Sequence, residues 1–185
     1  MPSQRFHRAA VLGAALVCAV LFAGPALAAS APAKPAPLTD ANIAAIVLAA
    51  NTIDIDNANL ALKRSADKSV QEFAHMMITD HTSVNDKAKA LAGKLKLKPV
   101  ANATSRGLVK SMATKRGALA RLHGAAFDKG YMDNEVSYHQ AVIDMLDQTL
   151  VPGAQNAELK DLLTSVKPAF EAHLAHAKEV RAGLK

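Results

Sequence analysis

The sequence predicts an all-α protein, a bundle of four long helices with one additional short helix in the central crossover. Three observations support this fold class. Apolar residues recur at intervals of three and four along four long stretches, as on the buried face of a helix. No stretch shows the alternation that is typical of a strand. Of the 185 residues, 50% are apolar, only 4% are aromatic and none is Trp, a composition that favours helix over sheet.

The first 28 residues have the features of a secretory signal peptide. Arg5 and Arg8 form a basic start, an apolar run follows, and Ala26-Leu27-Ala28 is a cleavage site of the A-x-A type. We therefore expect cleavage before Ala29 and an exported protein of the periplasm or cell envelope. A retained membrane anchor is the alternative, but the apolar run is short for a bilayer span of ~20 residues.

Removal of the signal would change the chemistry that the chain offers. The single cysteine, Cys18, lies in the signal, so the remaining chain would have no disulfide and no multi-cysteine zinc site. Loss of Arg5 and Arg8 would lower the formal net charge from +6 to +4. No later stretch is apolar enough to span a bilayer, so we expect no membrane span after cleavage.

The helical domain is predicted over residues 39–185, after an Ala/Pro-rich tether at residues 29–38. The first helix is expected from about Asp40 to Ser65, because Thr39 and Asp40 form a capping pattern. Its buried face is formed by apolar residues at helical spacing: Ile43, Ile46, Val47, Ala50, Ile53, Leu60 and Ala61.

The second helix is expected from Ser69, its N-cap, to Leu95. A loop around Pro99 follows. Three further helices are predicted at residues 104–122, 125–150 and 156–183. Pro152-Gly153 is expected to form the turn before the last helix, and Pro168 to kink that helix.

Polar side chains interrupt the apolar stripe of every long helix. They are Asp54 and Asn57 in the first, Asp80 and His81 in the second, Glu135 and His139 in the helix at 125–150, and His173 in the last. A buried carboxylate or imidazole without a partner is costly, so each should be paired, hydrated or metal-bound. Imidazole and carboxylate ligate transition metals, and the cores of helix bundles are where such sites are built. A simple hydrogen-bonded polar core is the alternative.

Four stretches of the sequence resemble exported bacterial proteins of the domain of unknown function 4142 family. They are FAHMMITDHTSVNDKAKALA from Phe73, HGAAFDKGY from His123, VSYHQAVI from Val136 and KPAFEAHLAHAKEV from Lys167. The resemblance covers about residues 38–185. It implies a ferritin-like bundle in the cell envelope, without an established activity.

The resemblance also marks individual positions. Those that match the family pattern are Asp80, His81, His139 and His173. Family members commonly carry Glu where this chain has Asp54, which shortens the reach of that carboxylate by one methylene.

A di-iron centre of the ferritin type is not expected. Ferritin-like di-iron enzymes use two Glu-x-x-His pairs and two further Glu. Here only Glu72 and His75 have that spacing, and His75 lies far round the helix from the apolar stripe. Glu135 and His139 are spaced by four residues instead. A mononuclear His-rich site fits the sequence better.

Ten basic residues and no acidic one lie between Lys87 and Arg121. Lys94, Lys96 and Lys98 form the densest part of this run. The run could bind an anionic lipid or polysaccharide of the envelope, or it could be an ordinary solvated surface. Nucleic acid is not expected as a partner, because no aromatic residues are interleaved for base stacking.

We therefore expect an exported, non-catalytic envelope protein whose core holds one metal ion. The expected ligands are His81, His139 and His173, with Asp54, Asp80 or Glu135 as carboxylate partners. Zinc, iron, copper and manganese all accept such ligands. Two alternatives stay open. One is a structural or stress-related module that acts through its basic surface, and the other is an enzyme such as a metal-dependent oxidase.

Overall fold

Residues 37–185 are described by a computed structural model, and this part of the chain is helical and contains no strand. The all-α prediction is therefore confirmed. The predicted signal peptide and most of the predicted tether lie outside the described residues. The helices are α1 (Asp40–Arg64), α2 (Lys68–Lys94), α3 (Ala103–Leu119), α4 (Gly124–Met145), α5 (Val151–Gly153) and α6 (Ala157–Gly183), with the π-helical turn η1 (Leu146–Leu150) between α4 and α5.

Short polar side chains cap the helices where the chain turns. Thr39 accepts a hydrogen bond from the amide of Asn42, whose side chain accepts in return from the amide of Thr39, which closes a capping box. The predicted N-cap of α2 is wrong by two residues. Asp67, not Ser69, caps this helix, because its carboxylate accepts from the amides of Ser69 and Val70.

The end of α4 differs from the prediction. At Leu146 the helix widens into the π-helical turn η1, and helical residues then continue to Gly153. Pro152 is part of this helical continuation, at the second position of α5. The predicted turn at Pro152-Gly153 is thus helical, and the chain reverses over residues 154–156. α6 is helical on both sides of Pro168.

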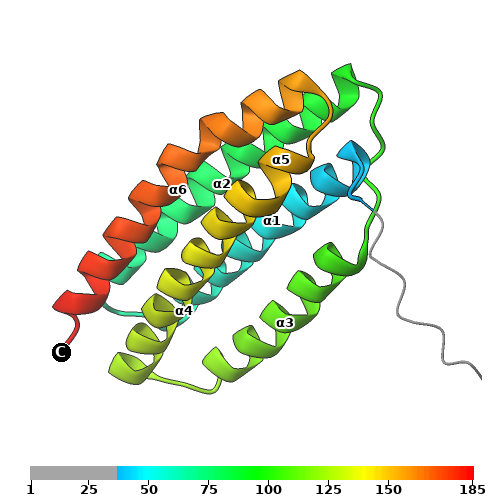
Figure 1. Ribbon diagram of the computed structural model, residues 1–185. Coiled ribbons are helices and arrows are strands. Elements are labelled where there is room, and N and C mark those ends of the chain that lie inside the picture. The colour runs from blue at the N-terminus through cyan, green and yellow to red at the C-terminus, as the bar shows by residue number, and fades with distance from the viewer. Residues whose placement is uncertain (1–36) are drawn as a thin grey trace, which may run out of the picture. The chain divides into compact units, whose positions relative to one another are not determined.

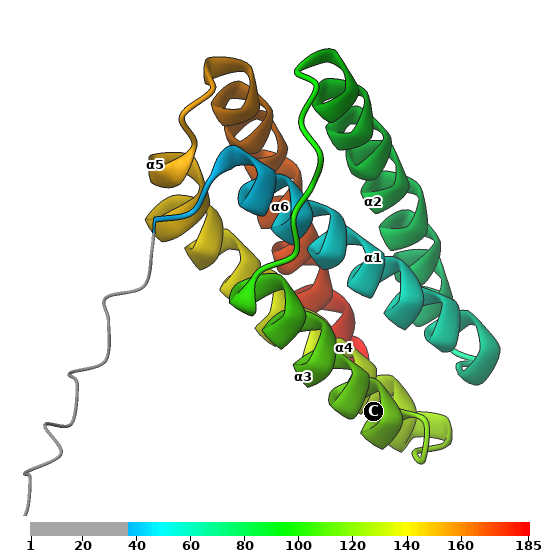
Figure 2. The same ribbon diagram turned by 90° about the vertical axis from the view of Figure 1, so that its right-hand side faces the viewer.

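The four long helices α1, α2, α4 and α6 lie side by side (Figure 1). α1 and α2 form one antiparallel pair, α4 and α6 form the other, and the pairs meet through α1 with α4 and α2 with α6. The shorter α3 lies along the outside, mainly against α1 (Figure 2). None of the helices within residues 37–185 is long and apolar enough to cross a membrane.

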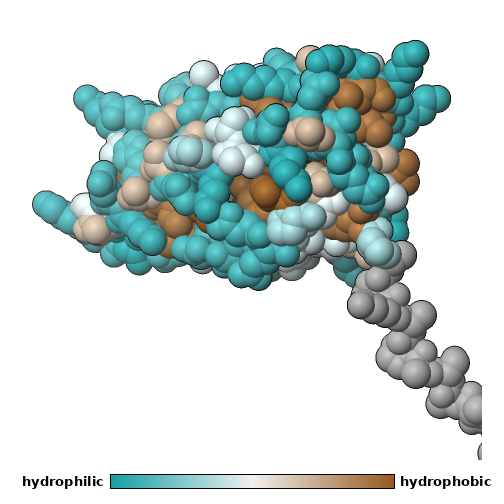
Figure 3. All heavy atoms as spheres, turned by 45° about the horizontal axis from the view of Figure 1, so that its top comes forward, coloured by the Kyte–Doolittle hydropathy of each residue, from teal (hydrophilic) through white to brown (hydrophobic). Residues whose placement is uncertain are grey.

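The core consists of two apolar clusters with a polar layer between them. The Leu146 cluster includes Ile46, Val84, Val142 and Leu163, and the Phe73 cluster includes Ala58, Tyr131 and Ala177. Along α1 the two clusters are separated by Asp54 and Asn57, along α2 by His81, and along α4 by Glu135. On these three helices the polar layer therefore lies between the two apolar clusters. Hydrophilic residues cover most of the outer surface on the face shown in Figure 3.

Candidate metal centre

Three histidines from three helices meet in the polar layer. His81 comes from α2, His139 from α4 and His173 from α6, and none is more than 3% exposed. Their ring centroids lie 5.7 Å (His81–His139), 5.3 Å (His81–His173) and 5.5 Å (His139–His173) apart. One nitrogen of each ring lies within 4.8 Å of a nitrogen of the other two. Three different helices thus bring the three rings together.

The ring of His81 is oriented by an asparagine on the neighbouring helix. The amide nitrogen of Asn51 donates to the carbonyl of Val47 at 2.9 Å, which directs the amide oxygen of Asn51 toward His81. His81 Nδ1 lies 2.7 Å from this oxygen and donates its hydrogen to it. The lone pair of His81 is therefore on Nε2, which points into the layer.

The other two rings are held by acceptors in the same way. His139 Nδ1 lies 3.0 Å from the backbone carbonyl of Glu135, and His173 Nε2 lies 2.9 Å from Asp80 Oδ2. Both partners are acceptors, so these nitrogens carry the hydrogens and the lone pairs lie on His139 Nε2 and His173 Nδ1. A histidine that donates one ring N–H to a carbonyl or carboxylate and leaves the other nitrogen free has the arrangement of a metal ligand.

The three free nitrogens are buried and unpaired. His81 Nε2, His139 Nε2 and His173 Nδ1 have no hydrogen-bond partner among the residues that the structure describes. Three unpaired acceptors in one buried layer are costly unless a cation, a donor or water satisfies them.

Burial keeps the three rings neutral. It is the largest cause that lowers the pKa of His81 well below its usual value, with the other two histidines adding to the effect. Burial also lowers the pKa of His139 to about 4. It lowers the pKa of His173 as well, although the hydrogen bond to Asp80 opposes the shift. A neutral imidazole is the form that binds a metal, so the site is ready for one at neutral pH.

Two buried carboxyl groups complete the layer. Asp54 on α1 is 3% exposed and Glu135 on α4 is fully buried. Asp54 Oδ2 lies 3.6 Å from His81 Nε2, and Glu135 Oε2 lies 3.6 Å from His139 Nδ1. Asp54, Glu135 and His139 form a second group whose ligand atoms lie within 4.8 Å of one another. His139 belongs to both groups.

Burial raises the pKa of both carboxyl groups. The pKa of Asp54 is raised well above its usual value by burial first and by the charge of Glu135 second. Burial raises the pKa of Glu135 to about 7, although the neighbouring polar side chains of Asp54, Asn134 and Asn57 oppose the shift. The pair therefore holds protons near neutral pH, and an approaching cation would displace them.

Replacing Glu135 by Gln should change how stability depends on pH in protein stripped of metal with a chelator. The usual pKa of 4.5 applies to the unfolded chain, and the folded value is about 7. Between pH 4.5 and pH 7 the Glu135 carboxyl binds a proton in the folded protein but not in the unfolded chain. Its contribution to the free energy of unfolding is therefore complete below the unfolded pKa and is lost as the pH rises through 7. Relative to the wild type, E135Q should gain about 3 kcal/mol in free energy of unfolding from about pH 4.5 to about pH 8.

Urea unfolding at a series of pH values measures this gain. Glu179→Gln, an exposed glutamate of α6, is the matched control and should show a difference from wild type that does not vary with pH. A constant offset for E135Q as well would contradict the raised pKa of Glu135.

The remaining predicted residues lie elsewhere. Asp80 is not in either group; its side chain is 45% exposed and it acts on the layer through His173. Glu72 and His75 are exposed, as predicted. Lys94, Lys96 and Lys98 are also exposed, at the end of α2 and in the loop after it, and Lys94 forms an ion pair with Glu158 on α6.

Sequence reasoning missed several members of the layer. Asn51, Asn134 and Tyr131 are buried beside the predicted residues, and Tyr131 Oη and Asn134 Oδ1 have no partner within the described range. Asn51 follows Val47 by four residues on the apolar stripe, so helical spacing could have identified it as inward-facing. Its pairing with His81 depends on the contact between α1 and α2, which spacing does not reveal.

Comparison with known proteins gives a family and a fold. No curated protein matches the chain. A crystal structure of a secreted DUF305 protein from Streptomyces coelicolor is similar, with a TM-score of 0.63 and 11% identity, over 77% of this chain and 91% of that one. At this identity the likeness concerns the fold alone. The family described as Domain of unknown function (DUF4142) matches residues 24–180, so the chain belongs to this family.

Proposed function

We propose that this member of the DUF4142 family is an exported protein that holds one transition-metal ion in the core of its helical bundle. His81, His139 and His173 are its nitrogen ligands. Asp54 or Glu135 supplies a carboxylate oxygen: Asp54 Oδ2 lies 3.6 Å from the free His81 Nε2, and Glu135 forms the second group with Asp54 and His139. Asp80 and Asn51 hold two of the rings in place and do not bind the ion.

The proposal rests on three buried histidines that each leave one ring nitrogen without a partner and that form a group with ligand atoms within 4.8 Å of one another. Each of these nitrogens has its lone pair available, because the other nitrogen of the same ring donates to a fixed acceptor. An ordinary hydrogen-bonded core would pair both nitrogens of each ring. A cation at this point would satisfy all three acceptors at once.

The chemistry of the donors supports a transition metal rather than calcium or magnesium. Hard cations prefer all-oxygen sites, whereas imidazole suits zinc, copper and iron, and a carboxylate also suits manganese. Three imidazoles with a carboxylate leave zinc, iron, copper and manganese as candidates. The acceptors behind His81, His139 and His173 would keep each ring in the tautomer that binds.

The wider setting of the site is also proposed. Residues 1–28 act as a cleaved signal for export to the periplasm or cell envelope, residues 29–38 as a tether, and residues 39–185 as a ferritin-like four-helix bundle domain. Four long helices that share one polar layer support this classification. The family match and the DUF305 neighbour agree with a helical protein, and the A-x-A site at Ala26-Leu27-Ala28 supports export.

Metal retention by the purified, untagged protein tests the proposal. The protein is stripped with a chelator, mixed separately with zinc, copper, iron or manganese, desalted and measured by elemental analysis. We expect about one equivalent of at least one metal to remain bound. At 100 times its Kd this metal should stabilise the fold by about 3 kcal/mol and raise Tm by roughly 5–10 °C. If the protein retains none of the four metals, the proposal fails and the polar layer is structural.

A further inference from the structure

A groove runs along the outside of the bundle between α1 and α3, away from the polar layer. Its first part is a hollow of about 330 Å³ whose walls include Ala45 and Ala49 of α1 and Val109 and Ala113 of α3. Ala49 and Val109 also line a second hollow, of about 250 Å³, which continues toward Ile53. The two hollows share Ala49 and Val109, and we call them together the α1–α3 groove.

The floor of the groove is apolar and open. Alanines face each other across it, so α3 approaches α1 without filling the space between them. Val109 is 52% exposed in this floor. Val100, also 52% exposed, lies next to the groove, because the loop that carries it is tied to α1 by the hydrogen bond from its amide to the carbonyl of Ala41. Two of the three large apolar residues exposed within residues 37–185 thus gather here.

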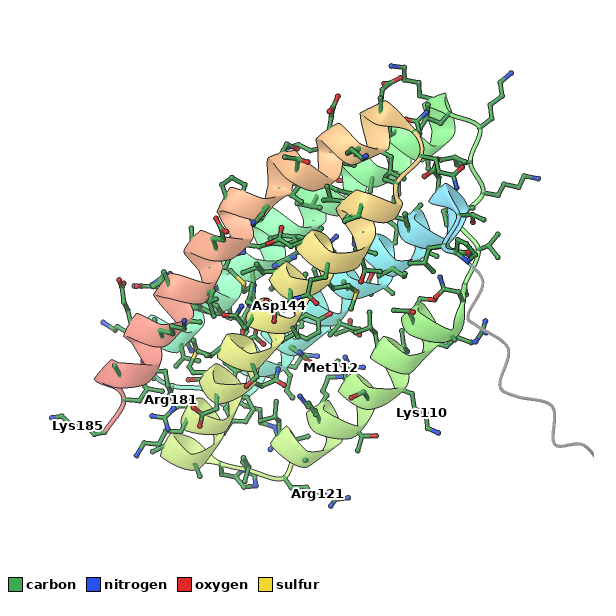
Figure 4. The ribbon with its side chains drawn as sticks, viewed as in Figure 1. Lys110, Met112, Arg121, Asp144, Arg181 and Lys185 are labelled. Carbon is green, nitrogen blue, oxygen red and sulfur yellow. The ribbon has the colours of Figure 1, made fainter. Side chains whose placement is uncertain are left out.

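The rim of the groove is cationic at one end. Arg106 and Lys110 line the first hollow, one helical turn apart on α3, a helix without any acidic residue. Neither forms an ion pair with any residue in the described part of the chain. Arg106 Nη1 donates to the carbonyl of Ala101 at 2.9 Å, which holds the guanidinium at the rim. Lys110 points away from the bundle (Figure 4).

The far end of the groove is neutral. There Arg116 Nη1 lies 3.0 Å from Asp56 Oδ2, so this pair compensates its own charge. The groove therefore has two unpaired cations, then an apolar floor, then a neutral end. From Ala45 to Ile53 the apolar floor extends over about 12 Å of helix.

We propose that the α1–α3 groove binds a single-chain anionic amphiphile of the fatty-acid class. Its carboxylate binds Arg106 at the rim, where the exposed Lys110 side chain can turn toward it, and its alkyl chain lies over Ala49 and Val109 toward Ile53. A guanidinium and an ammonium recognise a carboxylate by charge-assisted hydrogen bonds. A polysaccharide would leave the apolar floor uncovered, and a nucleic acid would find no aromatic side chain to stack on among the residues that line it. This site is independent of the metal centre.

Calorimetric titration of the purified full chain with alkanoates tests the proposal. The probes are hexanoate, octanoate and decanoate below their micelle concentrations, with acetate and decanol as controls for the chain and the charge. Binding should tighten with chain length, by up to about fourfold for each methylene that is buried. Acetate should not bind measurably, and decanol should bind at least tenfold more weakly than decanoate.

Variants separate the head group from the chain. The double substitution Arg106→Gln and Lys110→Gln should weaken decanoate binding at least tenfold. Ala49→Leu should weaken it by filling the hollow, and V109T, a conservative change of similar size at an exposed position, should weaken it by a smaller factor. Lys178→Gln, an exposed lysine of α6, is the matched control and should bind as the wild type does. Circular dichroism confirms that each variant is folded.

Three results would overturn the proposal. The first is an affinity for alkanoates that does not depend on chain length. The second is decanoate binding that survives the double substitution. The third is binding to anionic phosphatidylglycerol vesicles without binding of free decanoate, which would make this face a membrane-docking surface instead of a groove for one chain.

Discussion

Replacing His139 by Ala should raise the Kd for the metal by at least about 100-fold, more than any other single substitution in the polar layer. His139 is the one residue that belongs both to the three-histidine group and to the group with Asp54 and Glu135. Its loss therefore removes a ligand whichever group holds the ion. H173A and Asp54→Asn, by contrast, each change only one of the two groups.

The prediction is measured by competition between the protein and a chromophoric chelator. His75→Ala is the matched control, because His75 lies on the exposed face of α2 and should not affect binding. Asp80→Asn tests the support of His173 and should weaken binding by about 10- to 100-fold, less than H139A.

Because His139 packs against Phe73 and Phe170, urea unfolding of the metal-free variants must show that they are folded. His139→Gln, which fills more of the space, provides a second variant if H139A unfolds. Wild-type affinity in a folded His139 variant would show that this ring is not a ligand.

Replacing Phe73 by Ala should lower the free energy of unfolding by about 3–5 kcal/mol, the largest effect on stability that we expect. Phe73 is fully buried in the second apolar cluster. Its ring makes edge contacts with Tyr131 on α4 and His176 on α6, with centroids 6.3 Å and 5.5 Å away. Removing it therefore leaves a cavity where three of the four long helices meet.

Urea unfolding of metal-free protein measures this loss. Val109→Ala is the control, since Val109 is 52% exposed and its truncation should change stability by no more than about 0.5 kcal/mol. A loss below about 1 kcal/mol for F73A would mean that the Phe73 cluster does not pack as described.

Much of the fold follows from local pattern in the sequence. The last helix is predicted at residues 156–183 and observed as α6, Ala157–Gly183, with Asn156 as its N-cap. The two agree because Asn156 and Gly183 are local signals that do not depend on the rest of the chain. Periodicity also identified the inward positions of His81, Glu135 and His139, since the rotation of a residue about its helix is determined by its spacing from the apolar residues. The errors lie at the ends of helices. Ser69 and Asp67 are both good caps, and only the backbone geometry distinguishes them.

The partners of the inward side chains follow from how the helices pack against one another. The amino-acid sequence establishes that this protein is helical and that each long helix carries a polar group on its buried face. It did not determine that Asn51 orients His81, that Asp80 holds His173 from the surface, or that α3 leaves a groove beside α1. These contacts join helices far apart in the chain, and they depend on the relative rotation and depth of those helices to within a fraction of a turn. Helical periodicity determines the face on which a residue lies, and the packing of one helix against another determines its partner.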